Sequence, residues 1–468
     1  MTDHTSTLFR DVEVDGVRTD VLVAGGRVRR IGHGLRPDAD GEVVDGDGGA
    51  LLPGLHDHHV HLAALAAALR SVHVGPPSVT TPEQFAAALA AADAWTPPGE
   101  WIRAVGYHES VAGPLDRDVL DRLVGRRPVR VQDRSGKRWT LSSVALEHLC
   151  AVDPGHPAVH RGADGRPTGV VDRGDELLAA ALPDGFPNLG PVGELLARFG
   201  VTGVTDCTPY RDPGGHAALA AAAAGGQLPQ EVWVTGGVEL AGAAPPEPLR
   251  SGPVKVLLDE DRLPELGELA DRIATSHRAG RAVAVHTVTA ATLAVAIAAW
   301  DLAGVGPADR IEHGSVITPP AADRIAAMGL TVVTQPGFVA ERGDRYLVDT
   351  DEDERPHLYR CATLLERGIP VAGSTDAPYT DPDPWHAVAA AMDRRAPTGQ
   401  VVGAGERLDL ERALGLFLGD PADPGRRRRR VAVGAPADLC LLARPLRGLT
   451  TAPTAADVRA TYRAGRPL

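Results

Sequence analysis

Eight short apolar runs recur along the middle of the chain, and helix-patterned segments rich in Ala and Leu separate several of them. Continuous runs of Val, Ile and Leu are typical of parallel strands that are buried on both faces. Eight β/α units of this kind predict an α/β fold built on a (β/α)8, or TIM, barrel. The predicted strands are residues 50–62, 201–208, 231–237, 253–260, 282–288, 310–316, 330–336 and 369–378.

Both ends of the chain carry a different pattern. Residues 7–50 contain short alternating runs broken by Gly and Asp, and "RVAVGAPADLCLLARPL" holds two more runs rich in β-formers. We expect these ends to pair into a small β-sandwich domain of residues 1–50 plus 431–468. The barrel domain then occupies residues 51–430.

One connection in the predicted barrel is too long for a βα loop. Residues 63–200 separate the first two strands, and this stretch contains strand and helix patterns of its own. We therefore expect an insertion at about residues 80–195. It would serve either as a lid with substrate contacts or as a structural addition, and the sequence leaves both open. Substrate-binding residues stay unknown, with polar and aromatic candidates at Tyr107, His108, Arg134, Lys137 and Trp139.

Composition excludes several classes of protein. A net charge of −13 argues against a nucleic-acid-binding surface, and the run "RRRRR" at 426–430 is interpreted as a solvated loop rather than an anion site. The longest apolar stretch, at 290–300, is too short to span a bilayer and predicts a buried helix. Four widely spaced cysteines form no Cys-x-x-Cys pair, and the first residues lack the pattern of a signal peptide. We expect a cytoplasmic protein with reduced thiols and a small-molecule substrate, without nucleic-acid or membrane partners; a homodimer stays open.

Polar residues stand at or near the carboxyl ends of the predicted strands, where barrel enzymes carry their catalytic groups. Each has an ordinary structural interpretation: a hydrogen-bonded core histidine, a snorkelling lysine or an aspartate in a turn. Their joint occurrence favours a site. The residues are His59 and His61 on strand 1, Lys255 on strand 4, His286 on strand 5, His313 on strand 6, Gln335 on strand 7 and Asp376 on strand 8.

These residue types suit divalent metals. Strand alternation points His59 and His61 to the same side, so both can bind one ion, and it points the neighbouring His56 and His58 away. His286 and His313 come from adjacent strands and can bind a second ion. We expect two zinc ions, with iron or manganese as alternatives.

Two further residues would complete this predicted site. A buried lysine is a poor metal ligand unless its amine is carboxylated, which would turn Lys255 into an anionic bridge between the two ions. Asp376 would be both a metal ligand and the catalytic base for a water whose pKa the metal lowers.

The motifs "PGLHDHHVH", "VKVLLDE", "VAVHTV", "RIEHGS", "GSTDAP" and "VGAPADLCLL" resemble those of the amidohydrolase superfamily. Within it, the chain is most similar to the branch that contains N-substituted formamide deformylase. The resemblance implies a hydrolase acting on carbon–nitrogen bonds other than peptide bonds. It also implies the metal-ligand roles given above for His59, His61, Lys255, His286, His313 and Asp376.

Two other functions stay open. A deaminase with one metal is disfavoured, because such enzymes usually carry a glutamate just after the strand-5 histidine and "HTVTAATL" has none. A non-catalytic barrel that binds a small molecule would be marked by loss of ligands, and all six are present.

Overall fold

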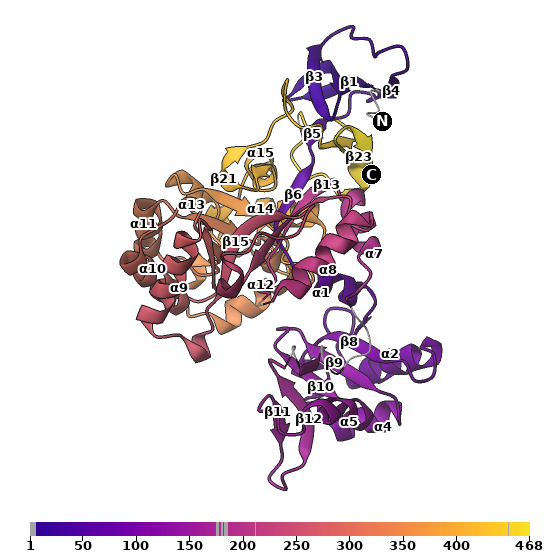
Figure 1. The fold of residues 1–468 in the computed structure, drawn as a ribbon, viewed down its shortest axis with the longest axis vertical. Helices are drawn as coiled ribbons and strands as arrows, with labels where there is room; N and C mark the ends of the chain where they lie inside the picture. The colour runs from indigo at the N-terminus through magenta and orange to yellow at the C-terminus, as the bar shows by residue number, and fades with distance from the viewer. Residues whose placement is uncertain (1–5, 175–176, 179–180, 182–185, 211, 448) are drawn as a thin grey trace. The chain divides into compact units, whose positions relative to one another are not determined.

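The computed structural model describes residues 6–174, 177–178, 181, 186–210, 212–447 and 449–468. Its centre is an eight-stranded parallel sheet, and each of the eight predicted strands is present (Figure 1). The predicted α/β barrel is therefore confirmed. In sheet order, the strands are β6 (Leu55–Val60), β13 (Val201–Asp206), β14 (Glu231–Gly236), β15 (Arg250–Leu257), β16 (Val283–Thr287), β17 (Arg310–His313), β18 (Thr331–Thr334) and β19 (Val371–Gly373).

Hydrogen bonds between β6 and the segment after β19 bring the first and last strands together. The Asp376 N–H donates to the carbonyl of His59 over 2.8 Å, and the His61 N–H donates to the carbonyl of Ala377 over 2.9 Å. The side chain of Asp57 adds a third link by accepting from the Thr375 N–H over 3.1 Å. The sheet thereby curls into a nearly closed barrel.

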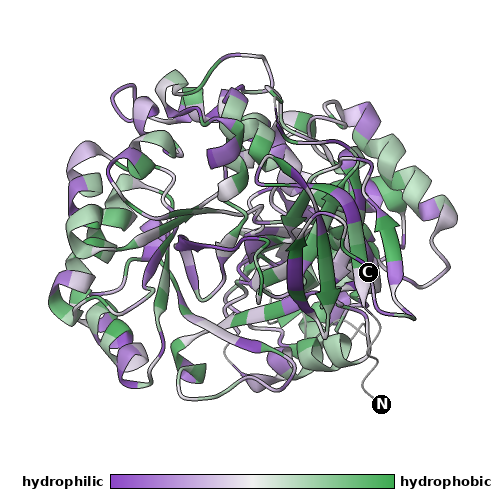
Figure 2. Cartoon of the chain, turned by 90° about the horizontal axis from the view of Figure 1, so that it is seen from above, coloured by the Kyte–Doolittle hydropathy of each residue, from purple (hydrophilic) through white to green (hydrophobic). Residues whose placement is uncertain are grey.

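Helices follow most of the strands and cover the outside of the barrel. In Figure 2 they carry both hydrophobic and hydrophilic residues, as expected for helices with one buried face. The predicted buried helix at 290–300 lies within α10, whose N-terminus is closed by a capping box of Thr289 and Thr292. The helices are α8 (Pro213–Ala224), α9 (Leu266–Arg278), α10 (Ala290–Ala303), α11 (Pro319–Met328), α12 (Gly337–Asp349), α13 (Ala362–Glu366), α14 (Pro384–Asp393) and α15 (Leu410–Gly415), with α1 (Leu62–Leu69) and α7 (Gly190–Arg198) flanking the insertion.

Two four-stranded sheets join the ends of the chain. Their shared core includes Phe9 from one end and Tyr462 from the other, whose rings meet edge to face at 4.8 Å. The division into residues 1–50 plus 431–468 and 51–430 stays a prediction, and residues 1–5 lie outside the described residues. The sheets are β3 (Arg27–Gly32), β2 (Val17–Ala24), β1 (Thr7–Val14) and β4 (Glu42–Asp45), and β24 (Arg466–Pro467), β23 (Val458–Arg463), β22 (Leu439–Leu442) and β5 (Leu51–Pro53).

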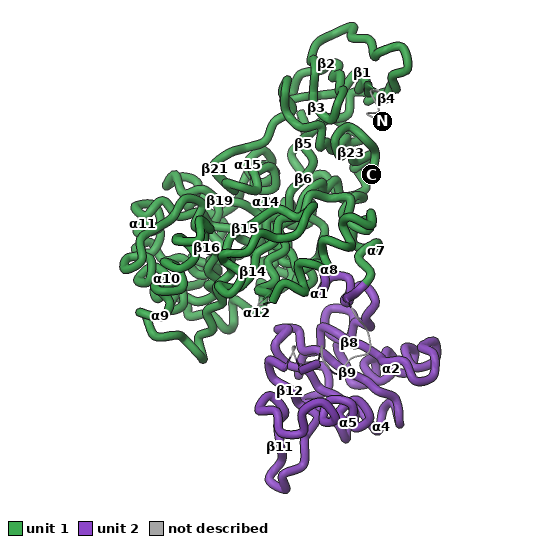
Figure 3. Tube along the Cα trace, viewed as in Figure 1, with its two compact units in different colours: residues 1–62, 188–468 green, residues 63–187 purple. Residues whose placement is uncertain are grey.

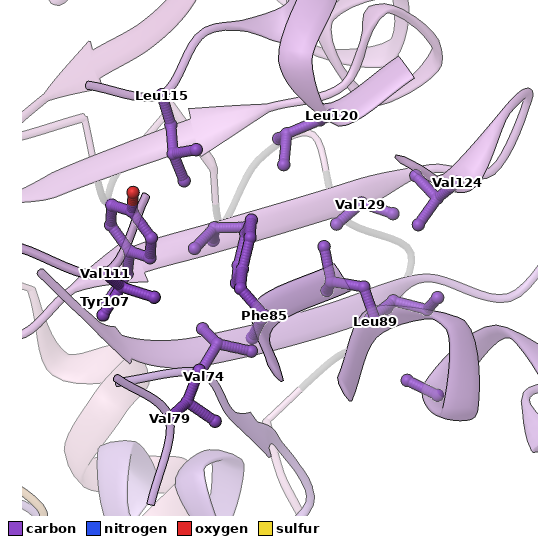
Figure 4. Packing of buried hydrophobic residues seen from close by; sticks show 14 residues of the cluster. Val74, Val79, Phe85, Leu89, Tyr107, Val111, Leu115, Leu120, Val124 and Val129 are labelled. Carbon is purple, nitrogen blue, oxygen red and sulfur yellow. The ribbon is translucent and has the colours of Figure 1, made fainter. Parts of the chain in front are cut away.

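Residues 63–187 form a compact unit of their own, and residues 1–62 and 188–468 form the other (Figure 3). One core of the unit 63–187 packs Phe85 and Leu89 of α2 against Tyr107 and Val129 of its sheet (Figure 4). The elements are β7 (Val72–His73), β8 (Ile102–Tyr107), β9 (Val129–Asp133), β10 (Arg138–Leu141), β11 (Val159–Arg161) and β12 (Pro167–Asp172), with α2 (Pro82–Trp95), α3 (Glu109–Ala112), α4 (Arg117–Val124) and α5 (Ser143–Val152).

The prediction of a loop at 426–430 was wrong in part. Arg426 to Arg428 end strand β21 (Asp423–Arg428), which pairs with β20 (Gly419–Asp420). Partners within the chain hold all five arginines, including Glu411 for Arg428 and the Gly419 carbonyl for Arg429. A run of arginine can enter a strand because its exposed side chains find carboxylates and carbonyls nearby.

All four cysteines carry free thiols. Within the described residues, no helix combines the length and the apolar character that a membrane crossing requires.

We predict that Phe85→Ala selectively destabilises residues 63–187. Phe85 is 1% exposed in the core of Figure 4, and removal of such a ring costs about 3–5 kcal/mol. Hydrogen-exchange mass spectrometry should show lost protection in peptides from 63–187 and unchanged protection in the barrel. Trp95→Ala, on the same helix but 68% exposed, is the control. Equal loss in both units would show that they unfold as one.

Candidate metal centre

The end of β6 places two imidazoles beside one carboxylate. The Nε2 atom of His59 lies 3.5 Å from Oδ1 of Asp376, and the Nε2 atom of His61 lies 3.3 Å from the same oxygen. His59 and Asp376 are buried, whereas His61 is partly exposed. These three residues form a group whose ligand atoms all lie within 4.8 Å of one another.

Two of the predicted site residues, His313 and Asp376, have an unusual backbone conformation. His313 and Asp376 both adopt positive φ angles, of 68° and 58°, which side-chain-bearing residues rarely do. Each stands at or just after the end of its strand, so the turn redirects its side chain toward the barrel mouth. Such strained positions cluster at functional sites.

Lys255 and the other two histidines lie next to this group. The Nζ atom of Lys255 is 3.3 Å from Nε2 of His59, and the lysine is buried. The rings of His286 and His313 have centroids 4.4 Å apart, and the ring of His313 lies 4.9 Å from that of His59. The structure thus brings all six predicted residues to one end of the barrel. Within the described residues, neither His286 nor His313 belongs to a three-residue group of that tightness.

The electrostatics of the site favour neutral imidazoles. Burial lowers the pKa of His59 and of His313 well below the ordinary value, and the charges of Lys255 and His286 act in the same direction. A neutral imidazole keeps the lone pair that binds a metal. His59 and His313 are therefore held in the protonation state that coordination requires.

Glu312 is a residue of the site that the sequence reasoning missed. Its Oε2 atom lies 2.5 Å from Nδ1 of His59, and Arg310 Nε donates to its Oε1 atom over 2.6 Å. Burial opposes ionisation of Glu312, but the charges of Arg310 and Lys255 outweigh it and lower the pKa of the carboxyl. Arg310 and Glu312 share one side of β17 by alternation, and this charged pair inside a fully buried strand was the signal available.

The other histidines also have partners for their Nδ1 atoms. Nδ1 of His61 lies 3.2 Å from the hydroxyl of Thr208, and Nδ1 of His313 lies 2.9 Å from Oε1 of Gln335. Gln335, which the sequence places at the end of strand 7, is thus a hydrogen-bond partner of His313.

A second group of candidate ligands consists of His59, Cys207 and Glu312. The guanidinium of Arg310 already lies among them, donating to Glu312 over 2.6 Å and contacting Sγ of Cys207 at 3.6 Å. Burial also raises the pKa of the Cys207 thiol well above its ordinary value. A fixed cation and a protonated thiol argue against a metal ion here.

The remaining histidines of β6 make other contacts. Nε2 of His56 lies 3.0 Å from the hydroxyl of Thr205. The ring of His58 lies 4.6 Å from that of His56, and its two nitrogens find no hydrogen-bond partner among the described residues. Neither ring belongs to the tight groups of ligand atoms.

The candidate substrate residues of the insertion fall into two groups. Tyr107 and Trp139 are core residues, and the Tyr107 hydroxyl donates to the Gly113 carbonyl over 2.5 Å. These two are thus structural positions in the unit 63–187. His108 caps α3, and Arg134 and Lys137 lie in the turn between β9 and β10.

The fold and the site together define a (β/α)8-barrel protein with a candidate metal centre of histidine and aspartate at the carboxyl ends of its strands. A sequence profile described as the amidohydrolase family matches residues 42–468, and the chain belongs to that family.

Relatives across nearly the whole chain agree with this assignment. N-substituted formamide deformylase of Arthrobacter pascens is 22% identical over 497 residues, covering 91% of this chain and 90% of the relative. The putative amidohydrolase YtcJ of Bacillus subtilis is 23% identical over 86% of this chain and 85% of its own. An uncharacterized metal-dependent hydrolase from Pyrococcus horikoshii is similar in structure, with a TM-score of 0.76, 19% identity and coverage of 95% and 99%. At that identity the structural likeness establishes the fold alone.

Proposed function

We propose that the protein is a metal-dependent amidohydrolase that cleaves a carbon–nitrogen bond, of amide type but not a peptide bond, in a small molecule by metal-activated water. One observation carries the metal proposal. Oδ1 of Asp376 is buried and has no hydrogen-bond partner among the described residues, yet it faces two Nε2 atoms at 3.3 and 3.5 Å. Two ligands of a tetrahedral zinc ion, each about 2.0–2.1 Å from the metal, lie about 3.3–3.4 Å apart.

In this proposal, His59, His61 and Asp376 would hold the first ion, and His286 and His313 would contribute to a second. Lys255, carboxylated on its amine, would offer an oxygen to each ion. When bound, such ions lower the pKa of a coordinated water and polarise the carbonyl that it attacks. Zinc suits these ligands, and iron or manganese would also be accepted.

The choice of lysine at position 255 supports the bridge. The chain contains 48 Lys and Arg residues, and only Lys137 and Lys255 are lysines. Arginine thus supplies nearly all the basic side chains of this chain, yet the basic residue inside the barrel strand β15 is a lysine. Lysine amines lose their proton and react with carbon dioxide far more readily than a guanidinium, which stays charged. An ammonium between two divalent cations would be repelled, whereas a carbamate would be attracted.

Asp376 is the proposed general base and general acid of the reaction. Its carboxylate takes the proton from the attacking water and passes it to the leaving nitrogen, which must be protonated to depart.

Two alternatives make different predictions. A deaminase of the same fold would need an acid to protonate a ring nitrogen, and the residues that follow His286 offer none. A zinc-containing adenosine deaminase from Xanthomonas campestris is similar in structure, with a TM-score of 0.52 at 16% identity, covering 99% of this chain and 92% of its own, which speaks only to the fold. A non-catalytic barrel would bind amides without turnover.

We predict that the purified protein hydrolyses members of a panel of N-formyl, N-acyl and cyclic amides. Activity should vanish on metal chelation and return with zinc, iron or manganese, because the ions activate the water. Asp376→Asn should abolish turnover, and Asp381→Asn, on the same loop, should not. Ammonia release from aminopurines or aminopyrimidines alone would instead support a deaminase, and metal-independent turnover would contradict the proposal.

We predict that Lys255 is carboxylated. Protein loaded with metal in carbon-13-labelled bicarbonate should show one carbamate carbon signal by NMR. Lys255→Met should lose this signal and fall from about two metal ions per chain to about one, because its bridging oxygens are gone. Lys137→Met, the single other lysine, should retain both. A carbamate signal that persists in Lys255→Met, or a wild-type protein with one ion and no signal, would exclude the bridge.

A further inference from the structure

Glu312 lies beneath the proposed metal centre and joins two of its neighbours. One carboxylate oxygen meets Nδ1 of His59 at 2.5 Å, and the other accepts from Arg310 over 2.6 Å. All three side chains are almost fully buried. Burying a charged pair costs free energy unless its groups are satisfied, so this placement needs a reason.

The contact differs in kind from those of the other site histidines. His61 and His313 direct Nδ1 toward neutral oxygens, those of Thr208 and Gln335. Oδ2 of Asp376 also approaches Nδ1 of His313, but at 3.8 Å it is beyond hydrogen-bond distance, whereas the carboxylate contact at His59 is 2.5 Å. A hydrogen bond to a charged acceptor is roughly twice as strong as one between neutral groups and fixes the imidazole tautomer more firmly.

We propose that Glu312 is a positioning residue for the metal centre. Its carboxylate holds the proton of His59 on Nδ1, which leaves the lone pair on Nε2, the atom that faces Asp376 and Lys255. Arg310 in turn fixes Glu312 by donating to its other carboxylate oxygen over 2.6 Å. This makes His59 the most firmly oriented ligand of the centre. The inference rests on the proposed metal-dependent function.

A second buried pair in the chain provides a matched comparison. Glu406 accepts from Arg360 Nε over 3.0 Å, as Glu312 does from Arg310, but its other contacts are to the backbone N–H groups of Cys361 and Thr363 and to the Thr363 hydroxyl. Glu406 therefore anchors a loop and contacts no residue of the site. Substitution at Glu406 reports the structural cost of losing a buried glutamate, and substitution at Glu312 reports that cost plus the effect on the centre.

The experiment compares Glu312→Gln with Glu406→Gln in the full-length protein. In Glu312→Gln the amide N–H2 can turn toward Nδ1 of His59, which moves the imidazole proton to Nε2 and blocks the ligand atom. Zinc affinity, measured by competition with a chromophoric chelator, should fall about 10–100-fold in Glu312→Gln. It should stay at the wild-type value in Glu406→Gln, although both variants lower the melting temperature.

The outcomes separate this inference from the proposed function. A wild-type protein that binds no zinc defeats the proposed function itself. A wild-type protein that binds zinc, with Glu312→Gln binding as tightly, overturns only the role of Glu312.

A second measurement applies if Glu312→Gln does not fold. Nitrogen-15 histidine spectra of metal-free wild-type protein, with the His59 signal identified by its absence in His59→Asn, should show the proton on Nδ1. A proton on Nε2 would overturn the inference.

Discussion

The closure of the barrel between β6 and the segment after β19 is the contact on which the site depends. Asp57 accepts from both the N–H and the hydroxyl of Thr375, and the backbones of His59 and Asp376 are hydrogen-bonded directly. These bonds join residues more than 300 positions apart in the chain. They set the spacing between the Asp376 carboxylate and the imidazoles of His59 and His61. The observed 3.3–3.5 Å is the separation that a shared ion would need.

The inside of the barrel balances charges that would each be costly alone. Arg310 and Glu312 satisfy one another, and the burial that lowers the pKa of His59 and His313 removes charge from the imidazoles. What remains at the mouth is the lysine and the aspartate, with Oδ1 of Asp376 lacking a hydrogen-bond partner among the described residues. A divalent ion would satisfy that oxygen. The positive φ angles of His313 and Asp376 occur at this site, where backbone strain tends to be found in functional centres.

Much of this architecture could be predicted from the sequence, because burial on both faces leaves a continuous apolar run at each parallel strand. The same apolar runs predicted that His59, Lys255 and Asp376 lie at or near the carboxyl ends of their strands. Glu312 was harder to place than His313, since alternation sets the two on opposite sides of the strand and the left-handed backbone of His313 is not readable from the sequence. Tyr107 and Trp139 became core residues because the insertion builds its own sheet, which no local pattern around them specified.

We expect one metal ion to be held by His59 and His61 at the end of β6 and by Asp376 in the segment after β19. Anomalous X-ray diffraction from zinc-loaded crystals, recorded on both sides of the zinc absorption edge, tests it most directly. We predict a peak about 2.0–2.2 Å from Nε2 of His59, Nε2 of His61 and Oδ1 of Asp376, with Nδ1 of His59 still on Glu312. Zinc bound elsewhere in the chain, with those three atoms unliganded in a fully loaded crystal, would contradict the account.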